Sequence, residues 1–219
     1  MLSRLRLGLP PAQDMPQSCS CGADLAKDPS HFLSCKLMMK TCLNARHNLI
    51  VHRLSVVANR LGATCLIEPS GLDASSGKRP DLLISLPHAT FLVDVSICHP
   101  CAKSHIPAAQ KPLGTARKRE QEKHHKYDAI AKDLSIRFLP FVMESYGGLG
   151  TDATKVLSML IPPDSSPLAN VFSLPDLPRE LRSSIAVALQ QGNALALMIG
   201  LSHSRSLFTR NALRAGRWD

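Results

Sequence analysis

The most constraining feature of this chain is the stretch at residues 77–98, where two apolar segments flank Pro87 and His88. Apolar segments on either side of a short turn are typical of a β-hairpin. If the turn is centred between Pro87 and His88, a symmetric loop places Asp81 on one strand opposite Asp94 on the other. The stretch therefore predicts two paired strands that carry two facing carboxylates.

Facing carboxylates are typical of a cation site. Directly opposed residues on paired strands have Cβ atoms about 5 Å apart, where like charges repel. A hard cation such as Mg²⁺ removes this repulsion, and its usual ligands are one or two carboxylates and substrate phosphate. We therefore expect Asp81 and Asp94 to bind Mg²⁺ or Mn²⁺, with Glu68 nearby. Alternatively, one aspartate caps a turn near Arg79 and the other is a solvated edge residue.

The composition favours a nucleic-acid partner. The 219 residues suffice for one domain with small appendages, and the formal net charge of +9 indicates a polyanionic partner. Of nucleic acid and an acidic membrane surface, we favour nucleic acid. The best candidate for a membrane span, residues 185–201, is interrupted by polar residues at 190–193, so we expect no membrane association.

Cysteine and histidine spacing predicts a zinc knuckle. The chain has 7 cysteines, and we expect no secretory signal, which favours thiols or metal ligands over disulfides. Cys19, Cys21, His31 and Cys35 form the four-ligand set of a structural zinc site, with His31 and Cys35 on one helical turn. Two alternatives remain open: Cys42 replaces one ligand, or the four side chains are unrelated.

A second group of similar residues follows the hairpin. It comprises Cys98, His99, Cys101 and His105. These residue types can also bind a metal, but a thiol behaves equally well as a small apolar side chain. We favour the interpretation that they pack at a strand end.

A basic helix is predicted at residues 36–61, where apolar residues recur at helical spacing and Gly62 follows as a stop. This segment contains no acid, so we expect it to hold a phosphate backbone. The expected DNA-binding residues here are Lys40, Arg46, His47 and Arg53. His47 lies beside the apolar stripe, and a core histidine is the alternative interpretation of it.

A second, highly charged helix is predicted at residues 115–134. Its inward stripe, at steps of three and four, includes Lys123 and Tyr127 one turn apart. Arg117 and Lys126 point elsewhere, and we expect them to contact DNA together with Lys78 and Arg79 before the first hairpin strand. The alternative is that Lys123 extends along the helix to water.

The remaining segments complete a mixed α/β (α+β) fold. We expect strands at residues 63–68 and 136–142, with Pro140 either placing the second strand at a sheet edge or ending it early, and a short helix from Thr151. The predicted divisions are an N-terminal remnant (1–18), the knuckle (19–41), the main domain (42–160), a Pro/Ser linker (161–178) and a helical tail with a basic end (179–219). We expect Gly192 to interrupt the tail helix.

Two strand carboxylates and a lysine from the following helix are the groups that phosphodiester hydrolysis needs. A metal held by the carboxylates polarises the phosphate and activates water, while Lys123 orients the water or neutralises developing charge. The alternative is a non-catalytic nucleic-acid-binding protein whose acids are structural.

These motifs together resemble those of one known family. Residues 46–48 (Arg-His-Asn), 68–70 (Glu-Pro-Ser), 79–81 (Arg-Pro-Asp), Asp94 and residues 123–127 (Lys-His-His-Lys-Tyr) are similar to the restriction-endonuclease-like domain of site-specific non-LTR retrotransposons. The preceding Cys/His knuckle is similar to the one before that endonuclease. The resemblance covers roughly residues 19–160.

The resemblance implies a PD-(D/E)xK nuclease with an αβββαβ core that nicks double-stranded target DNA for target-primed reverse transcription. It implies that Asp81 and Asp94 are catalytic metal ligands, Lys123 the catalytic lysine and Tyr127 its neighbour. Element RNA, the rest of a reverse transcriptase polyprotein and a nuclear location are also implied. The strand that carries Asp94 lacks the usual Glu-x-Lys, so Lys111 is a rival lysine. A polymerase Tyr-x-Asp-Asp motif is absent from these residues, so we interpret the chain as a C-terminal portion.

Overall fold

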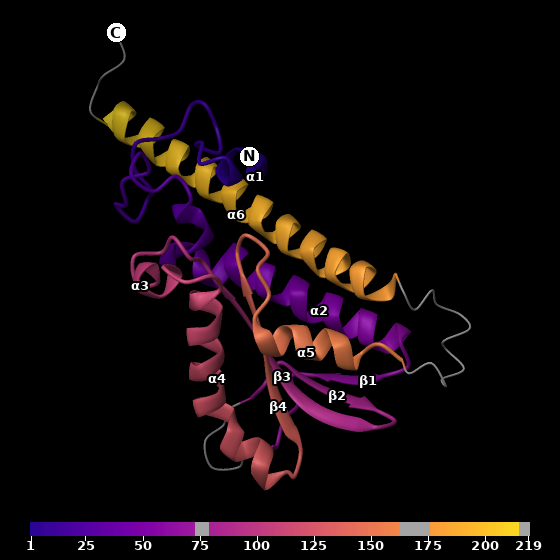
Figure 1. Ribbon diagram of the computed structural model, residues 1–219. Helices are drawn as coiled ribbons and strands as arrows, with labels where there is room; N and C mark the ends of the chain where they lie inside the picture. Colours follow the sequence, from indigo (N-terminus) through magenta and orange to yellow (C-terminus); the bar gives the residue numbers. More distant parts are fainter. Residues whose placement is uncertain (73–78, 163–175, 215–219) are drawn as a thin grey trace.

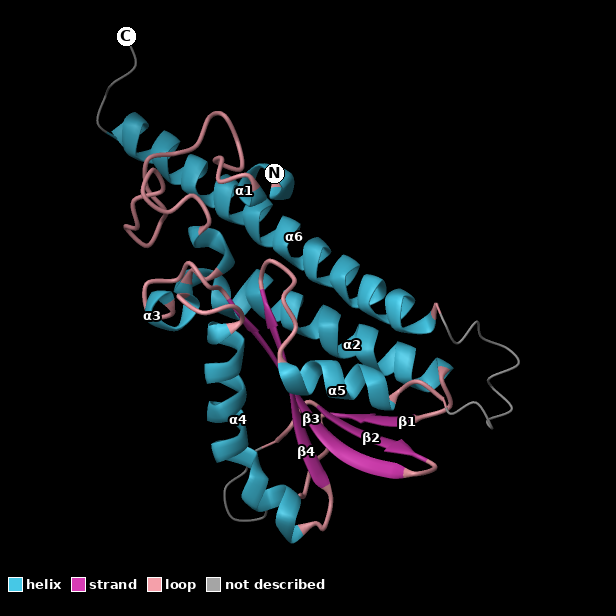
Figure 2. Cartoon of the chain, viewed as in Figure 1, coloured by secondary structure: helices cyan, strands magenta, loops and turns pink. Residues whose placement is uncertain are grey.

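The computed structural model describes residues 1–72, 79–162 and 176–214, with side chains up to residue 206. A four-stranded sheet has helix α4 on one face and helices α2 and α5 on the other, and α6 runs along α2 (Figures 1 and 2). This arrangement confirms the mixed α/β (α+β) class. The elements are α1 (Leu2–Arg6), η1 (His31–Leu33), η2 (Lys36–Met38), η3 (Met39–Leu43), α2 (Asn44–Arg60), β1 (Thr64–Ile67), β2 (Leu82–Leu86), β3 (Ala89–Cys98), α3 (Ile106–Ala109), α4 (Gly114–Asp133), β4 (Arg137–Glu144), α5 (Thr151–Met159) and α6 (Leu177–Arg214).

The sheet has the strand order β1-β2-β3-β4. β1, β2 and β3 form an antiparallel meander, and β2 and β3 are joined by the predicted tight turn, with Leu86 facing Ala89. The register continues outward so that Asp81, just before β2, is next to Asp94 in β3. β4 runs parallel to β3 and places Pro140 beside Asp94. Since proline cannot donate to a strand ladder, its position on the edge strand is the expected one.

The two faces of β3 pack against different helices. Successive side chains of a strand point to opposite faces of the sheet. Phe91 and Val93 therefore join the main core with α2, whereas Leu92 packs against Tyr127 of α4. Asp94 is two residues after Leu92, so its side chain is on the same face of the sheet and lies under α4. The alternation of the strand thus delivers this carboxylate to the charged helix.

The first third of the predicted basic helix is divided into shorter pieces. A 3₁₀ turn (η2) and a π-helical turn (η3) precede α2, which itself begins at Asn44. These turns have different numbers of residues per turn, so a single α-helical face does not extend back to Lys36. At the other end, Gly62 has a φ of +84°, a conformation that suits glycine and ends the helix as predicted.

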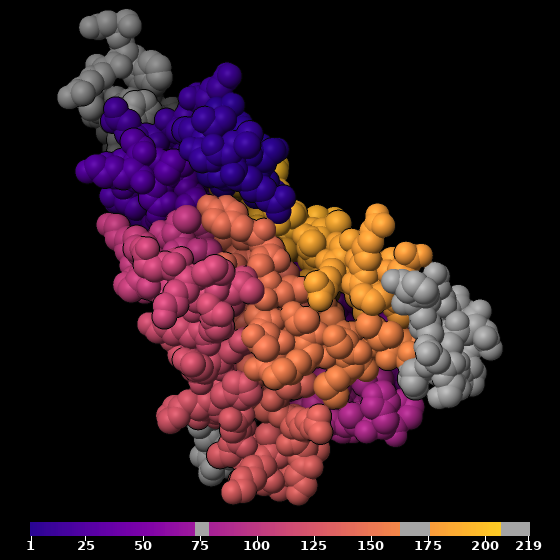
Figure 3. Space-filling view, in the orientation of Figure 1, coloured from indigo at the N-terminus to yellow at the C-terminus, as the bar shows by residue number. Residues whose placement is uncertain are grey.

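Helix α6 is continuous, so the predicted interruption at Gly192 is wrong. Its first turns contribute Leu181, Ile185 and Leu189 to the main core. Its later turns contribute Leu197 and Leu201 to a second core formed with the N-terminal segment. In Figure 3 that segment, in indigo, is gathered at one end of the molecule beside the C-terminal part of α6.

The length and composition of α6 also suffice for a membrane span. Within Leu177–Ser206 an 18-residue window has a mean hydropathy of 1.4, so the polar residues at 190–193 do not exclude a span, contrary to our expectation from the sequence. Half of this window is buried inside the protein. The core helix of a folded domain passes the same test, because burial against other helices requires the same apolar residues.

Candidate functional site

Asp94 and Lys123 form a buried ion pair. The side chain of Asp94 is 6 % exposed and that of Lys123 is 12 % exposed. Lys123 Nζ contacts Asp94 Oδ2, so the inward direction predicted for this lysine is observed. Lys111, the rival lysine, is exposed on the connection before α4.

Asp81 lies directly before β2, at the position next to Asp94 of β3. Its Oδ2 accepts a hydrogen bond from the backbone N–H of Val95 (2.6 Å) and lies 3.1 Å from Nε2 of His47. The Asp81 side chain thus accepts a hydrogen bond from the β3 backbone at a position directly before β2 begins. Burial opposes the charged form of His47, but the contact with Asp81 and the charge of Asp94 raise the histidine pKa.

Tyr127 lies one helical turn after Lys123, on the buried side of the Asp94–Lys123 pair. Its hydroxyl donates to the backbone carbonyl of Arg79 (3.1 Å) and accepts from Nζ of Lys126 (2.8 Å). Burial and the negative charges of Asp94 and Asp81 raise the pKa of Tyr127. Because Asp81 bonds to the backbone of Val95, the residue after Asp94, the two predicted acids lie next to each other in the sheet.

Glu68 is at the margin of this site. Its backbone N–H donates to the carbonyl oxygen of Asp81 (2.8 Å), which brings the two residues next to each other. Its side chain is 61 % exposed and pairs with Arg79 at 3.3 Å. The carboxylate is therefore directed to solvent rather than to Asp94 in this conformation.

The predicted DNA-binding residues have different environments. Arg46 is a correction: it is 3 % exposed, and its guanidinium donates to Asn193 Oδ1 (2.8 Å) and to the carbonyl oxygen of Leu33 (3.1 Å). Its place on α2 is on the face that packs against α6. Lys78 lies outside the described residues. Those with exposed side chains are Lys40, Arg79, Arg117 and Lys126, while His47 and Arg53 are half-buried.

The knuckle residues form a compact cluster that can hold a metal ion. The ligand atoms of Cys19, Cys21, His31 and Cys35 all lie within 4.8 Å of one another. The Sγ atoms of Cys19 and Cys35 are 3.8 Å apart, and Cys21 Sγ lies 3.0 Å from His31 Nε2. Zn–S bonds of about 2.3 Å in a tetrahedron put two sulfurs about 3.8 Å apart. The sulfur pair already has this spacing, whereas the Cys21–His31 distance would have to widen.

Local backbone structure brings these ligands together. Gly22, at a φ of +86°, allows a tight turn in which its N–H donates to the carbonyl of Cys19 (2.8 Å). His31 begins the 3₁₀ turn η1, and Cys35 follows in an extended conformation, so the two do not share the predicted α-helical turn. Cys42 is buried elsewhere, near the carbonyl of Met38. It does not belong to the cluster.

The second Cys/His group does not form a metal site among the described residues. His99 is buried, with Nδ1 2.7 Å from Ser145 Oγ and Nε2 2.9 Å from Ser30 Oγ. Burial lowers the pKa of His99 to about 4, so its ring is neutral. His105 Nδ1 contacts the backbone carbonyl of His99 (2.9 Å). The histidines are thus occupied by hydrogen bonds.

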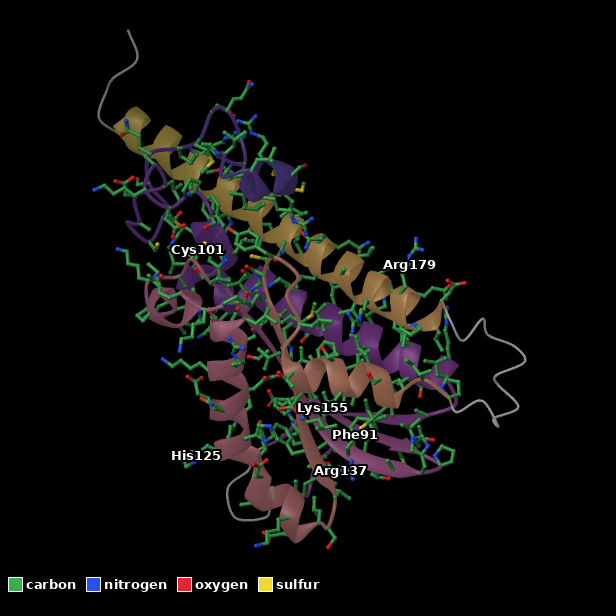
Figure 4. All side chains as sticks on the ribbon, viewed as in Figure 1. Phe91, Cys101, His125, Arg137, Lys155 and Arg179 are labelled. Carbon is green, nitrogen blue, oxygen red and sulfur yellow. The ribbon has the colours of Figure 1, made fainter. Side chains whose placement is uncertain are left out.

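A further polar network lies between α4 and α5, and we did not predict it from the sequence. Glu120 accepts a hydrogen bond from the backbone N–H of Asp152 (2.8 Å), which satisfies the first turn of α5. His124 bridges Asp152 and Asp128, at 2.8 Å from each. The available signal was Glu120 itself, an acid on the inward stripe of the helix. His125 points away from the sheet (Figure 4).

Comparison with known proteins does not assign this site. No protein-family model matches the chain, and no curated protein sequence matches it.

Proposed function

We propose that this chain is a divalent-metal-dependent DNA endonuclease domain with a PD-(D/E)xK fold, which nicks target DNA for target-primed reverse transcription of a non-LTR retrotransposon. The observation that carries the proposal is the buried Asp94–Lys123 pair beside the carboxylate of Asp81. A protein that only binds DNA has no use for a lysine and two acids gathered beneath a helix.

The carboxylates suit a hard cation. Mg²⁺ and Mn²⁺ prefer oxygen ligands, and Mg²⁺ keeps several waters beside one or two carboxylates. In the contacts of the two carboxylates described above, each aspartate uses its Oδ2 atom. When bound, such a cation polarises the phosphate and lowers the pKa of a bound water. Glu68 is a further candidate ligand only if its side chain turns inward from Arg79.

The residues of the chain then divide the remaining work. Lys123 is held by Asp94 at the position where its ammonium neutralises charge that develops on the phosphate. Water adds to phosphorus, the bond from phosphorus to the 3′ oxygen breaks, and that oxygen takes up a proton. The strand is left with a 3′-hydroxyl, which a reverse transcriptase needs as a primer, and a 5′-phosphate. Tyr127 fixes the helix that carries Lys123 by bonding to Arg79.

Exposed cations around this group supply the contacts to the phosphate backbone. Lys126 and Arg79 lie next to Tyr127, and Arg117 lies nearer the start of α4. Lys40 and Arg53 belong to the other helical layer. Contacts of this kind hold DNA in register without reading its sequence. The rest of a reverse transcriptase polyprotein, element RNA and a nuclear location belong to the same proposal.

The Cys₃His cluster holds Zn²⁺ in this proposal. Three sulfurs and one imidazole are a structural zinc ligand set. Asp28 Oδ2 lies 3.8 Å from Nδ1 of His31, on the opposite side of the ring from Cys21. A carboxylate in that position fixes the ring so that Nε2 faces the metal.

A plasmid-nicking assay tests the endonuclease. With Mg²⁺ or Mn²⁺ the intact chain should convert supercoiled plasmid to open circles, and Asp94→Asn and Lys123→Met should lower the rate by at least about 100-fold. Asp152→Asn is the matched control, because Asp152 is also a buried acid paired with a lysine (2.7 Å from Lys155) but lies outside the group. Nicking without added metal, or equal loss in all three variants, would refute the proposal.

One observation favours a second function, a nucleic-acid-binding protein without catalysis. A cleft of about 960 Å³ lies beside the Cys₃His cluster, and its lining includes Lys36 and Lys103 together with an Asp24–Lys27 pair and Asp28. If this second function is correct, no metal-dependent nicking will occur, but the affinity for DNA or RNA will fall steeply with salt concentration. The nicking assay distinguishes the two functions, and a smaller logarithmic salt slope for a Lys36→Gln, Lys103→Gln variant than for the intact chain would assign the binding to this cleft.

A further inference from the structure

The metal cluster is the start of a buried chain of hydrogen bonds. Asp28, which lies beside His31, accepts a hydrogen bond from the hydroxyl of Ser30 at 2.9 Å. Ser30 Oγ in turn lies 2.9 Å from Nε2 of His99. Because the Ser30 hydroxyl donates its proton to the hydrogen bond with Asp28, its oxygen must accept a hydrogen bond from His99. The contact therefore fixes Nε2 as the protonated nitrogen of that ring.

The tautomer of His99 also determines the direction of the hydrogen bond that its second ring nitrogen makes at the end of the sheet. A neutral imidazole with a proton on Nε2 has a lone pair on Nδ1. Ser145 Oγ lies 2.7 Å from Nδ1 and must donate to it. Ser145 directly follows β4, so His99 joins the knuckle to the end of the edge strand. Both of its ring nitrogens are used.

The chain continues to α6 and α2. The carbonyl oxygen of Ser145 accepts from Nδ2 of Asn193 (2.7 Å), and Oδ1 of Asn193 accepts from Arg46 Nη1 (2.8 Å). The other terminal nitrogen of Arg46 donates to the carbonyl of Leu33, two residues before Cys35. The hydrogen bonds thus lead back to the knuckle, and the backbone between Ser30 and Leu33 closes them into a polar ring.

Arg46 is adjacent in sequence to the histidine of the candidate nuclease site. His47, the next residue on α2, lies 3.1 Å from Asp81 Oδ2. The position of the first turn of α2 therefore decides where His47 holds that carboxylate. Nothing else in the first turn is tied to both the knuckle and α6 by side-chain hydrogen bonds among the described contacts.

We propose that His99 and Asn193 are positioning residues that couple the Cys₃His metal centre to Asp81 through Arg46 and the first turn of α2. Metal in the knuckle and correct placement of His47 then stabilise each other. The coupling between the knuckle and α2 stands on its own contacts, whereas its effect on cleavage rests on the proposed function.

The physical basis is the cost of leaving buried polar groups without partners. His99 is 2 % exposed, Arg46 3 % and Asn193 1 %. Loss of one member leaves its neighbours as buried donors or acceptors, which is more costly than loss of the bond itself. The neighbours must then move, and the movement is transmitted along the ring because protein interiors are close-packed.

The first test uses the knuckle metal and needs no activity. Zinc release to a chelator is measured for the intact chain, His99→Phe, Asn193→Leu and the double variant. Asn193 has no contact with the cluster, yet we expect Asn193→Leu to speed release several-fold, which is less than the roughly tenfold effect of losing a group bonded directly to a metal ligand. The double variant should release zinc no faster than the faster single one, because both changes break one ring.

Controls separate coupling from general destabilisation. His88→Phe changes an exposed histidine in the β2–β3 turn and should leave release unchanged. His99→Gln keeps a donor and an acceptor and should restore most of the slow release. The visible spectrum of the Co²⁺-substituted cluster, which reports ligand geometry, should shift in His99→Phe. Release rates that multiply in the double variant, or an Asn193→Leu rate equal to that of the intact chain, would overturn the coupling.

The second test concerns cleavage. Asn193→Leu should raise the Mn²⁺ concentration needed for half-maximal nicking several-fold, with a smaller change in the rate at saturating Mn²⁺. An unchanged Mn²⁺ requirement alongside active nicking would overturn the link to Asp81. Absence of nicking in the intact chain would instead refute the proposed function, and the zinc-release cycle would still decide the coupling.

Discussion

At the residue scale, the Asp94–Lys123 pair is the most consequential contact. Both side chains are largely removed from water, so each depends on the other for its charge to be tolerated. A surface pair would contribute little, but a buried pair leaves an uncompensated charge when one partner is removed. In the proposed endonuclease, catalysis and stability therefore depend on the same two side chains.

This dependence predicts a non-additive effect on stability. Lys123→Met should lower the free energy of unfolding by about 3 kcal/mol at pH 7, because the carboxylate of Asp94 is left buried without a partner. The double variant Asp94→Asn, Lys123→Met should recover part of the loss. Urea unfolding measures both, with the exposed Lys118→Met as control. A double variant less stable than Lys123→Met would contradict the prediction.

His124 gives a pH-dependent prediction at the same scale. Burial opposes its charged form, but hydrogen bonds to Asp152 and Asp128 outweigh it and raise the pKa of His124. A raised folded-state pKa stabilises the protein fully below about 6.5, the unfolded value, and the effect is lost as pH rises through the folded value. His124→Gln should therefore cost more stability at pH 6 than at pH 9.

Urea unfolding of the intact chain and of His124→Gln at these two pH values measures the difference. His125→Gln is the control, because this neighbouring side chain points away from the sheet. A cost that is equal at both pH values, or larger at pH 9, would show that His124 does not stabilise the fold as a cation.

At the scale of elements, helix α6 depends on a close approach to α2 at Gly192. A Cβ added there would lie 2.4 Å from Cγ of Arg46 and 2.9 Å from its Cα. The glycine is therefore required for packing, not as a helix break. The same approach permits Asn193 to reach Arg46.

Gly192→Ala tests this packing. In an exposed helix interior the change would stabilise by about 1 kcal/mol. Here we expect a loss of about 1–3 kcal/mol, because Arg46 and the α2 backbone must shift. Thermal and urea unfolding measure it, with Ser183→Ala on the exposed side of α6 as control. A stabilised Gly192→Ala variant would show that the two helices separate without cost.

At the scale of the whole molecule, the knuckle and the sheet domain share α6. Phe32 and Leu33 of the knuckle pack with Leu197 and Leu201, while Leu181 of the same helix belongs to the main core. Because one continuous helix is part of both cores, loss of structure in one core should lower the stability of the other.

Removal of the knuckle metal should therefore lower the melting temperature of the entire chain in one transition. Ligand binding to the folded state alone contributes RT ln(1 + [L]/Kd), or about 4 kcal/mol at 1,000 times Kd. Calorimetry with zinc, with chelator, and on Cys35→Ser measures the change. A separate low-temperature transition for the knuckle, with the main transition unmoved, would contradict the shared core.

The sequence by itself determined the local structure and the chemical types of the site. Apolar segments on either side of Pro87 and His88 predicted the hairpin, a symmetric turn predicted its register, and the helical stripe predicted that Lys123 points inward. These succeed because strand and helix periods, and turn residues, depend on neighbours a few positions away. Cys19, Cys21, His31 and Cys35 were likewise found from spacing.

Only the tertiary structure decided which polar residues are buried and with what. Arg46 has the sequence environment of a DNA contact, but Gly192 and Asn193, far along the chain, draw it into the interior. The roles of His99 and Glu120 also depend on partners from distant elements. A buried polar group is tolerated only where another segment supplies its hydrogen bonds, and no local pattern records that partner.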